Sequence, residues 1–439
     1  MNARLFAAAL SLALGLLAQP AWATPSTLQG VVRDQQSGRP IAQATVVLGP
    51  HIVVSDERGG FSLTVELGPT PSQISARAPG YRRSEKVLPI STDARNPHNQ
   101  PAITLSLSPL RAKGVYLSVY GIGSSSLRGE ALALIEKTEL NTLVIDVKGD
   151  RGLVPYRSAV LARAGLGPQT IITVRDMPAL LKDLRARGLY LIARIVTFKD
   201  DPLVAKHPQW AVRDAQGAIW KDREGLAWID PFQRAAWTHS LDMAEEAAQL
   251  GFDEVQFDYV RFPDAVGLSF SQPNHGPDAE AARVAAIGGF LTAARQRLAP
   301  YNVFISADIF GYVSWNSNDT QIGQQLEALA GLVDYLCPML YPSGFHLGIP
   351  EHRNPMEAPY EIVERSLRHA IQRTGLPGTR FRPWLQAFRD YAFDHRDFGE
   401  LEIRRQIEAA DSVGSSGWLL WNPKNRYGSA GLAERKPPP

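Results

Sequence analysis

The chain has 439 residues, of which 44% are hydrophobic and 21% charged, so it is neither too polar to fold nor apolar enough to lie mostly in a membrane. Lys and Arg total 46 against 44 Asp and Glu, and there is no long basic run, so nucleic acid is not an expected partner. Cys337 is the one cysteine, which excludes an internal disulfide and every metal site built from several cysteines.

The first 23 residues have the pattern of a secretory signal peptide. Arg4 precedes an apolar run over residues 5–18, and Ala21-Trp22-Ala23 supplies a small-x-small cleavage site. This run is shorter than the roughly 20 apolar residues that cross a bilayer, and no later run is long enough. We therefore expect residues 1–23 to be cleaved and the mature protein to be periplasmic or secreted, with no membrane span.

Residues 24–108 predict a small all-β sandwich. Short alternating or β-branched runs are separated by Gly, Pro and Asp turns, and no helical period appears; the runs are 30–32, 44–48, 61–65 and 103–107. The segments GVVRDQQSGRPIAQATVVL (30–48), SDERGGFSLTV (55–65) and ISARAPGYRR (74–83) resemble the carboxypeptidase regulatory-like domain, a transthyretin-like sandwich. The resemblance implies a rigid accessory module without chemistry of its own. Residues 108–113 are the expected linker.

Residues 113–430 predict a (β/α)8 barrel, an α/β fold. Eight apolar runs alternate with helical stretches, and parallel strands joined by helices close into a barrel at that number. The predicted strands are 114–120, 142–147, 189–196, 254–259, 303–308, 333–341, 381–388 and 417–421, and the predicted helices are 129–140, 177–187, 233–250, 278–298, 322–332, 359–373 and 397–413. An open doubly wound sheet is the alternative, but its Gly-rich phosphate turn is incomplete at residues 121–124. Residues 431–439 are expected to form a disordered tail.

Acidic residues stand where several predicted strands end, which is where a barrel carries its active site. Asp146, Asp258 and Asp308 follow otherwise apolar runs, and a carboxylate there is costly unless it is solvated, paired or functional. Two carboxyl groups facing each other suit glycoside hydrolysis, in which one protonates the leaving oxygen and the other attacks the anomeric carbon or activates water. We expect Asp258, beside Arg261, to be the nucleophile or base and Asp308 the general acid, while Asp146 either contacts a sugar hydroxyl or serves as a supporting charge.

The remaining candidates are polar or aromatic residues near predicted strand ends, where they could contact sugar hydroxyls or stack on sugar faces. The predicted substrate-binding residues are Asp146, Lys148, Arg194, Tyr259, Arg261, Tyr341, Trp384, Trp421 and Asn422, with Tyr120, Trp220 and Trp228 as further possible stacking rings. Each residue also has a purely structural interpretation, because aspartates often cap helices and tryptophans are usually packed.

Five motifs resemble a bacterial family of glycoside hydrolases that was long catalogued only as a domain of unknown function. They are KGVYLS (113–118), VIDVKGD (144–150), FDEVQFDYVRFPD (252–264), ISADIFGY (305–312) and DYLCPMLYPS (334–343). The resemblance implies a TIM barrel distantly related to α-amylase-like and α-galactosidase-like hydrolases. By that analogy Asp258 matches the nucleophile position, and Asp308 stands where amylase-like enzymes place a Glu acid.

The sequence lacks the residue patterns that zinc, serine-nucleophile or cysteine-nucleophile hydrolysis requires. The histidines form no zinc motif, no G-x-S-x-G is present, and Cys337 lies inside an apolar strand, so we expect no metal and no cofactor. The alternative function is a non-catalytic carbohydrate- or cell-wall-binding protein on the same barrel. The predicted partner is a poly- or oligosaccharide in either case, and the sequence leaves sugar identity and oligomeric state open.

Overall fold

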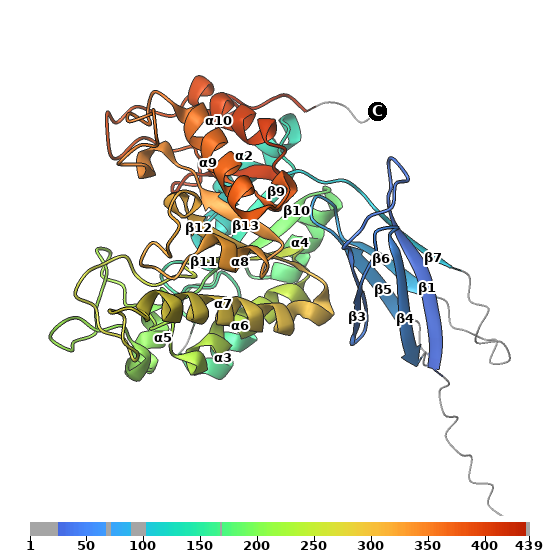
Figure 1. The fold of residues 1–439 in the computed structure, drawn as a ribbon, viewed down its shortest axis with the longest axis horizontal. Coiled ribbons are helices and arrows are strands. Elements are labelled where there is room, and N and C mark those ends of the chain that lie inside the picture. Colours follow the sequence, from blue (N-terminus) through green and yellow to red (C-terminus); the bar gives the residue numbers. More distant parts are fainter. Residues whose placement is uncertain (1–24, 67–71, 89–101, 167–168, 436–439) are drawn as a thin grey trace, which may run out of the picture.

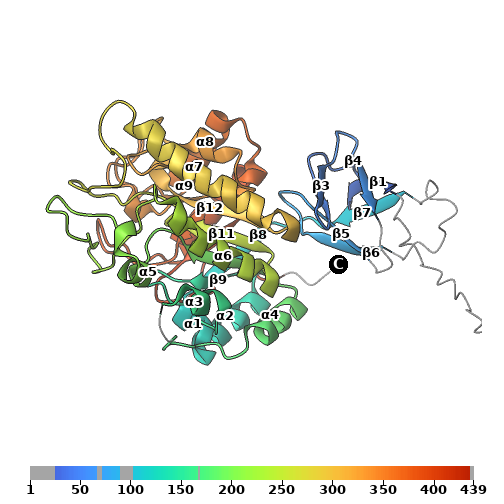
Figure 2. The ribbon, with the colours of Figure 1, turned by 90° about the horizontal axis from the view of Figure 1, so that it is seen from below.

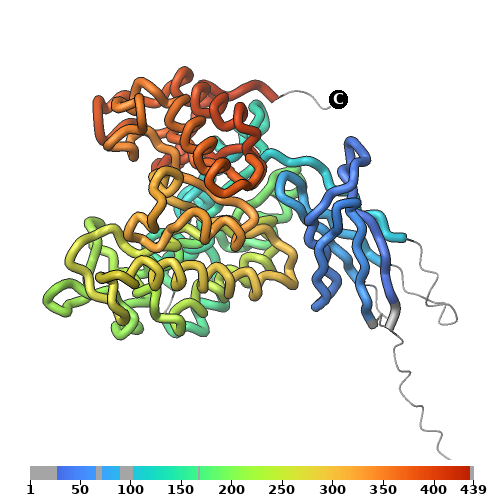
Figure 3. The backbone as a smooth tube through the Cα atoms, viewed as in Figure 1, coloured from blue at the N-terminus to red at the C-terminus, as the bar shows by residue number. Residues whose placement is uncertain are grey.

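The computed structural model describes residues 25–66, 72–88, 102–166 and 169–435, and the expected signal peptide at residues 1–23 lies outside them. The chain forms an N-terminal β-sandwich and then passes directly into a barrel surrounded by helices (Figures 1 and 3). Among the described residues, no helix is both long and apolar enough to cross a membrane.

The sandwich consists of two small sheets with the strand orders β4-β1-β7 and β3-β2-β5-β6. Its strands are β1 (Pro25–Asp34), β2 (Thr45–Leu48), β3 (His51–Val54), β4 (Gly60–Glu66), β5 (Ser72–Arg77), β6 (Ser84–Leu88) and β7 (Ile103–Leu107). In β7 the residues Ile103, Leu105 and Leu107 are buried and the two between them are exposed, as expected for a strand with one face on a core. The predicted all-β domain is confirmed, although the prediction omitted β3, β5 and β6.

The second unit is a closed barrel of eight parallel strands in the order β10-β11-β12-β13-β14-β15-β8-β9. These are β8 (Ala112–Leu117), β9 (Thr142–Lys148), β10 (Tyr190–Val196), β11 (Glu254–Asp258), β12 (Phe304–Phe310), β13 (Tyr335–Met339), β14 (Trp384–Gln386) and β15 (Gly417–Trp421). The predicted (β/α)8 barrel is therefore confirmed.

Helices cover the outside of the barrel (Figures 1 and 2). They are α1 (Val119–Gly123), α2 (Ser125–Lys137), α3 (Ala159–Ala164), α4 (Met177–Ala186), α5 (Asp201–Lys206), α6 (Arg234–Leu250), α7 (Ala279–Leu298), α8 (Leu326–Ala330), α9 (Pro359–Thr374) and α10 (Glu400–Ser412). The short helices α1, α3 and α5 were not predicted, because each is too short to show a helical period.

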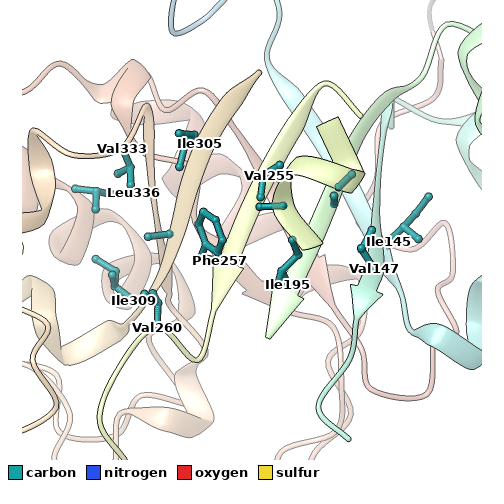
Figure 4. Packing of buried hydrophobic residues seen from close by; sticks show 14 of the residues in the cluster. Ile145, Val147, Ile195, Val255, Phe257, Val260, Ile305, Ile309, Val333 and Leu336 are labelled. Atoms are coloured by element: carbon teal, nitrogen blue, oxygen red, sulfur yellow. The ribbon is translucent and has the colours of Figure 1, made fainter. Parts of the chain in front are cut away.

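Both faces of the barrel strands are buried, which explains why their sequences are almost continuously apolar. Ile145, Ile195 and Phe257 point outward into the core between strands and helices (Figure 4). Val144 of β9 and Ile192 of β10 belong to a second cluster, which fills the inside of the barrel. Because side chains alternate along a strand, the residues two positions after these inward residues also face inward, at the carboxyl end of the barrel.

The sandwich contacts the opposite end of the barrel, where the strands begin. Arg77 of β5 forms a buried ion pair with Asp334, which precedes β13. Asn302, two residues before β12, donates from Nδ2 to Ser75 Oγ at 2.9 Å, and the Gly80 amide donates to Tyr335 Oη at 3.0 Å. The sandwich therefore leaves the carboxyl ends of the strands open.

The last described residues lie against the barrel. The Arg435 amide donates to the Lys137 carbonyl at 2.9 Å, and the Ala433 amide donates to Glu139 Oε1 at 2.9 Å. Residues 431–435, which we expected to belong to a disordered tail, are thus hydrogen-bonded to the end of α2 and the residues after it. Residues 436–439 of that expected tail lie outside the described range.

Candidate active site

A cavity of about 650 Å³ opens at the carboxyl ends of the barrel strands. Its wall contains charged and aromatic side chains from strand ends and from the loops that follow them. The lining residues are Arg194, Arg223, Asp258, Tyr259, Arg261, Asp308, Phe310, Gly311, Tyr312, Met339, Tyr341, Gly344, Phe345, Trp384, Phe388, Tyr391, Trp421 and Pro423. Both predicted catalytic carboxyl groups are among them.

Asp258 reaches the cavity as the last residue of β11 and is held by Arg194 of the neighbouring strand β10. Arg194 donates to Asp258 Oδ2 from Nη2 at 2.6 Å and from Nε at 2.9 Å. The other carboxylate oxygen, Oδ1, accepts from the Tyr259 amide at 2.6 Å. Charge-assisted hydrogen bonds of this kind stabilise the ionised form of a carboxyl group, as a nucleophile or base requires.

Arg194 also binds two other aspartates and so organises this side of the cavity. It donates from Nη1 to Asp146 Oδ1 at 2.7 Å and from Nη2 to Asp150 Oδ1 at 3.1 Å. Burial raises the pKa of Asp146 to about 6, although the charge of Arg194 and the hydrogen bond from Tyr116 Oη at 2.7 Å act in the opposite direction.

Asp308 lies on the adjacent strand β12 in a different environment. Its Oδ1 accepts a hydrogen bond from Trp384 Nε1 at 2.7 Å, whereas its buried Oδ2 has no hydrogen-bond partner among the described residues. Burial raises the pKa of the Asp308 carboxyl well above its ordinary value, and the negative charge of Asp258 raises it further. Within one cavity, Asp258 is thus paired with a cation whereas Asp308 is not and has a raised pKa, which is the pattern of an acid beside a nucleophile or base.

Two tyrosines complete the surroundings of these carboxyl groups. Tyr259 has a positive φ of 48°, an uncommon backbone conformation for a residue other than glycine. Such strain persists where the surrounding structure imposes it, often next to a functional group, and here it follows Asp258 directly. Burial, together with the charges of Asp308 and Asp258, raises the pKa of Tyr341 well above its ordinary value, so this phenol stays neutral and can donate a hydrogen bond.

Most of the predicted substrate-binding residues line the cavity: Arg194, Tyr259, Arg261, Tyr341, Trp384 and Trp421. Asp146 does not, because it is buried beneath Arg194 and Tyr116. The prediction that Asp146 contacts a sugar hydroxyl is replaced by a supporting role, which was its other predicted role.

Lys148 and Asn422, two of the predicted substrate-binding residues, are not part of the cavity wall. The strand β9 contains a bulge, so that Lys148 aligns with Ile195, whose side chain faces the outer core. Lys148 is fully buried and pairs with Asp200 at 2.5 Å, away from the cavity. Asn422 donates from Nδ2 to the carbonyls of Ala387 and Arg426 and thereby shapes the loops around it. Neither residue contacts the cavity.

The position of Arg261 in the sequence suggested that it pairs with Asp258. Arg261 does line the cavity, but it forms no ion pair with Asp258. Its Nη1 donates to the Phe262 carbonyl at 2.9 Å, and its guanidinium lies over the rings of Trp228, Tyr259 and Phe310. The hydrogen bonds to Asp258 come from Arg194 instead. Sequence proximity identified the wrong arginine. Arg194 pairs with Gln256 in the neighbouring strand, and its long side chain reaches Asp258 two residues further on.

The predicted stacking rings have several different roles. Tyr120, Trp220 and Trp228 are absent from the cavity wall, and Trp228 is buried behind it with Nε1 bound to Asp222 at 3.0 Å. Trp384 is only 1% exposed and serves mainly as the hydrogen-bond donor to Asp308. Trp421 stacks on Tyr116 with ring centroids 4.1 Å apart.

The sequence interpretation missed several residues of the wall, namely Phe310 at the end of β12 and the loop residues Arg223, Phe388 and Tyr391. Asp390 positions the last two by accepting hydrogen bonds from Ser343 Oγ and from the amides of residues 392, 393 and 395. The one available signal was the group of aromatic residues after the seventh strand, at 388–393.

No cluster of metal-binding side chains accompanies the cavity in the described part of the chain. Across residues 25–66, 72–88, 102–166 and 169–435, no group of three or more His, Cys, Asp or Glu side chains is arranged to hold a metal ion.

The closed barrel and the carboxyl pair at its carboxyl end define the class of this protein, a TIM barrel with an acidic site built from its strand ends. The chain belongs to the family described as "putative glycosyl hydrolase domain", whose model matches residues 114–427. No curated protein sequence matches the chain.

Among solved structures, the glycoside hydrolase domain of PgaB (BpsB) from Bordetella bronchiseptica is similar, with a TM-score of 0.52 and 14% identity over 72% of this chain and 94% of that one. A hypothetical protein from Ruminiclostridium thermocellum ATCC 27405 is 33% identical over 44% of this chain and 96% of its own, with a TM-score of 0.38. The catalytic domain of β-amylase from Paenibacillus polymyxa has a TM-score of 0.46 and 12% identity over 74% of this chain and 95% of its own.

Proposed function

We propose that this protein is a glycoside hydrolase that cleaves a poly- or oligosaccharide with Asp258 and Asp308. The observation that carries the proposal is the difference between the two carboxyl groups within one cavity. Asp258 is neutralised by two hydrogen bonds from Arg194, whereas Asp308 is buried, has a raised pKa and forms no ion pair with any described residue. The family description supports this chemistry, as does the fold shared with the Bordetella protein, which is named as a glycoside hydrolase domain.

In the proposed reaction, Asp308 transfers its proton to the glycosidic oxygen as the bond to the anomeric carbon breaks. Asp258 supplies electron density to that carbon, either by attacking it directly or by removing a proton from an attacking water. In the direct case, water then hydrolyses the glycosyl ester on Asp258 while Asp308 accepts the proton of that water. The route through the glycosyl ester returns each carboxyl group to its starting protonation state. In the water route Asp258 ends protonated and Asp308 ionised, and exchange of protons with the solvent restores both.

We further propose that the protein acts outside the cytoplasm, as a periplasmic or secreted enzyme. The support is the signal-like pattern of residues 1–23, and mass spectrometry of the N-terminus of the exported protein tests it. We retain the carboxypeptidase regulatory-like assignment of the sandwich as a proposal that rests on the segments at residues 30–83.

The activity is tested by incubating the protein with a panel of α- and β-linked polysaccharides and measuring new reducing ends. We expect cleavage of at least one polysaccharide by the wild-type chain and a loss of roughly a hundredfold or more in Asp258→Asn and in Asp308→Asn. Binding of a polysaccharide by all three proteins with cleavage by none would contradict the proposal and favour a carbohydrate-binding protein.

A further inference from the structure

The cavity contains cationic groups that the proposed chemistry does not use. Among the charged residues of its wall, Arg194 is paired with Asp258 and also with Asp146 and Asp150. Arg223 and Arg261 of the same wall form no ion pair with any described residue, although the charge of Asp258 acts on Arg261 across the cavity. A substrate that covers these cations partly desolvates them, and a negative charge on the substrate would offset that cost better than neutral hydroxyl groups.

Arg261 differs from the buried arginines of this protein. Arg77, Arg194, Arg283 and Arg382 are each buried with a carboxylate partner, as expected for a cation removed from water. Arg261, in contrast, takes part in no ion pair within the described part of the chain, and its only hydrogen bond there is from Nη1 to the Phe262 carbonyl. A guanidinium carries five N–H donors, so most of its donor capacity is unused.

The surroundings of Arg261 fix its position without neutralising it. The guanidinium carbon lies 4.4 Å from the ring centre of Phe310, 4.9 Å from that of Trp228 and 5.3 Å from that of Tyr259. These rings hold the planar group by cation–π contact at the cavity wall. Burial lowers the pKa of Arg261, but an arginine remains charged in proteins, so the wall presents a half-buried cation.

Arg223 is brought to the same wall by a loop that is firmly attached. Its neighbours Asp222 and Glu224 both pair with Lys199, with Nζ–O distances of 3.0 and 2.9 Å. Asp222 also accepts the hydrogen bond from Trp228 Nε1, and the Trp228 ring lies next to Arg261. Asp222 and Glu224 are thus held in place by these contacts. Arg223 itself is exposed and has no hydrogen bond or ion pair to any described residue.

We propose that the cavity recognises an anionic glycan and seats a charged sugar substituent, a carboxylate or a sulfate, against Arg261 and Arg223. This inference rests on the proposed hydrolase function and specifies its substrate class. Arginine suits the role because its planar fork can donate two parallel hydrogen bonds to one anionic group. Phe310 and Tyr391, from the same wall, would border the sugar ring.

Binding is tested with the full chain carrying Asp308→Asn, so that no probe is consumed. The probes are polygalacturonate, alginate and hyaluronan, each beside its carboxyl-reduced product, and dextran sulfate beside dextran. We expect at least one charged polymer to bind more tightly than its neutral counterpart by roughly tenfold, the loss expected when a hydrogen bond to a charged group is removed. Comparing the carboxylated polymers with dextran sulfate shows whether the site recognises a carboxylate or a sulfate.

Variants locate the effect. Adding Arg261→Gln or Arg223→Gln is expected to weaken binding of the charged polymer by roughly tenfold and that of the neutral polymer by less than about threefold. Arg223 is exposed on a loop, so its replacement should not destabilise the fold. The Arg223→Gln variant therefore still tests the inference if Arg261→Gln lowers the melting temperature. Arg58→Gln, exposed in a turn of the sandwich, is the matched control and should change neither affinity.

The outcomes separate this inference from the proposed function. Equal binding of charged and neutral polymers, or a preference that survives both substitutions, overturns the anionic subsite, even if the wild-type chain cleaves a neutral glycan. Arginine-dependent binding of an anionic glycan that the wild-type chain fails to cleave supports the subsite and contradicts the hydrolase.

Discussion

Arg194 is the residue on which the site depends most, because one guanidinium holds three carboxylates. It pairs with Asp146, Asp150 and Asp258 while lying over the rings of Tyr116 and Trp421. The nucleophile or base is therefore positioned by a buried cation from the neighbouring strand rather than by its own loop.

Replacing Arg194 tests this dependence. We expect Arg194→Met to lower the free energy of unfolding by about 3–5 kcal/mol, because Asp146 and Asp258 would remain as buried charges without a partner. The control is Arg187→Met, since Arg187 forms exposed ion pairs with Glu136 and Asp183 that contribute less than about 1 kcal/mol. Urea unfolding measures both values, and equal changes in the two variants would contradict the account.

Asp308 provides a prediction in which stability and pH are linked. The pKa of Asp308 is raised in the folded protein, so between the unfolded and folded pKa values the native state binds the proton more tightly than the unfolded chain. Stability from this group is therefore present at low pH and is lost as pH rises through the folded pKa. An asparagine at position 308 keeps an oxygen that can accept the hydrogen bond from Trp384 Nε1, but its side chain does not ionise.

We therefore expect Asp308→Asn to melt at a higher temperature than the wild-type chain, by a margin that increases as pH is raised from about 4. Thermal unfolding of both proteins across a pH series measures the margin. A constant margin, or one that shrinks with rising pH, would show that Asp308 has no raised pKa.

At the scale of elements, the barrel closes where β15 pairs with β8, and this closure depends on a glycine. Gly417 has a φ of 91° and pairs with Ala112. A Cβ at this position would lie 2.0 Å from the Ala112 carbonyl oxygen, which belongs to the backbone and cannot move aside easily.

We expect Gly417→Ala to cost about 3 kcal/mol or more, from backbone strain and from the clash together. Gly188 offers a matched control, since its φ is 78° but no atom would lie within 4 Å of a Cβ added there. Gly188→Ala should cost only about 1 kcal/mol. Chemical unfolding compares the two, and similar losses would mean that the close approach of β15 to β8 is unimportant.

The sequence predicted the strands well because both strand faces are buried, so that apolar runs mark them directly. It also predicted that Asp258 and Asp308 meet, since consecutive parallel strands end at the same edge. It failed where local geometry departs from period two, as in β9, whose bulge turns Lys148 outward. Loop residues such as Arg223 were missed because loop conformation leaves no periodic signal.

At the scale of the whole molecule, the sandwich and the cavity occupy opposite ends of the barrel. The sandwich contacts residues that precede or begin β12 and β13, whereas the cavity is built from residues at strand ends and beyond. The interface includes a buried ion pair between Arg77 and Asp334. The sandwich should therefore affect stability without affecting the chemistry.

We expect Arg77→Ala to lower the free energy of unfolding by about 3–5 kcal/mol, because Asp334 would be left as a buried charge, while kcat stays unchanged. Calorimetry and a rate assay at a temperature where both proteins are folded give the two numbers. A loss of kcat without a loss of stability would contradict the separation of the two ends.

The division of labour between Asp308 and Asp258 is tested most directly with two substrates of the same glycan. One is the polysaccharide, whose leaving oxygen needs a proton, and the other is a dinitrophenyl glycoside of its oligosaccharide, whose leaving group departs without one. We predict that Asp308→Asn loses roughly a hundredfold to ten-thousandfold on the polysaccharide but much less on the dinitrophenyl glycoside, whereas Asp258→Asn fails on both. Equal losses of Asp308→Asn on the two substrates would contradict its role as the general acid.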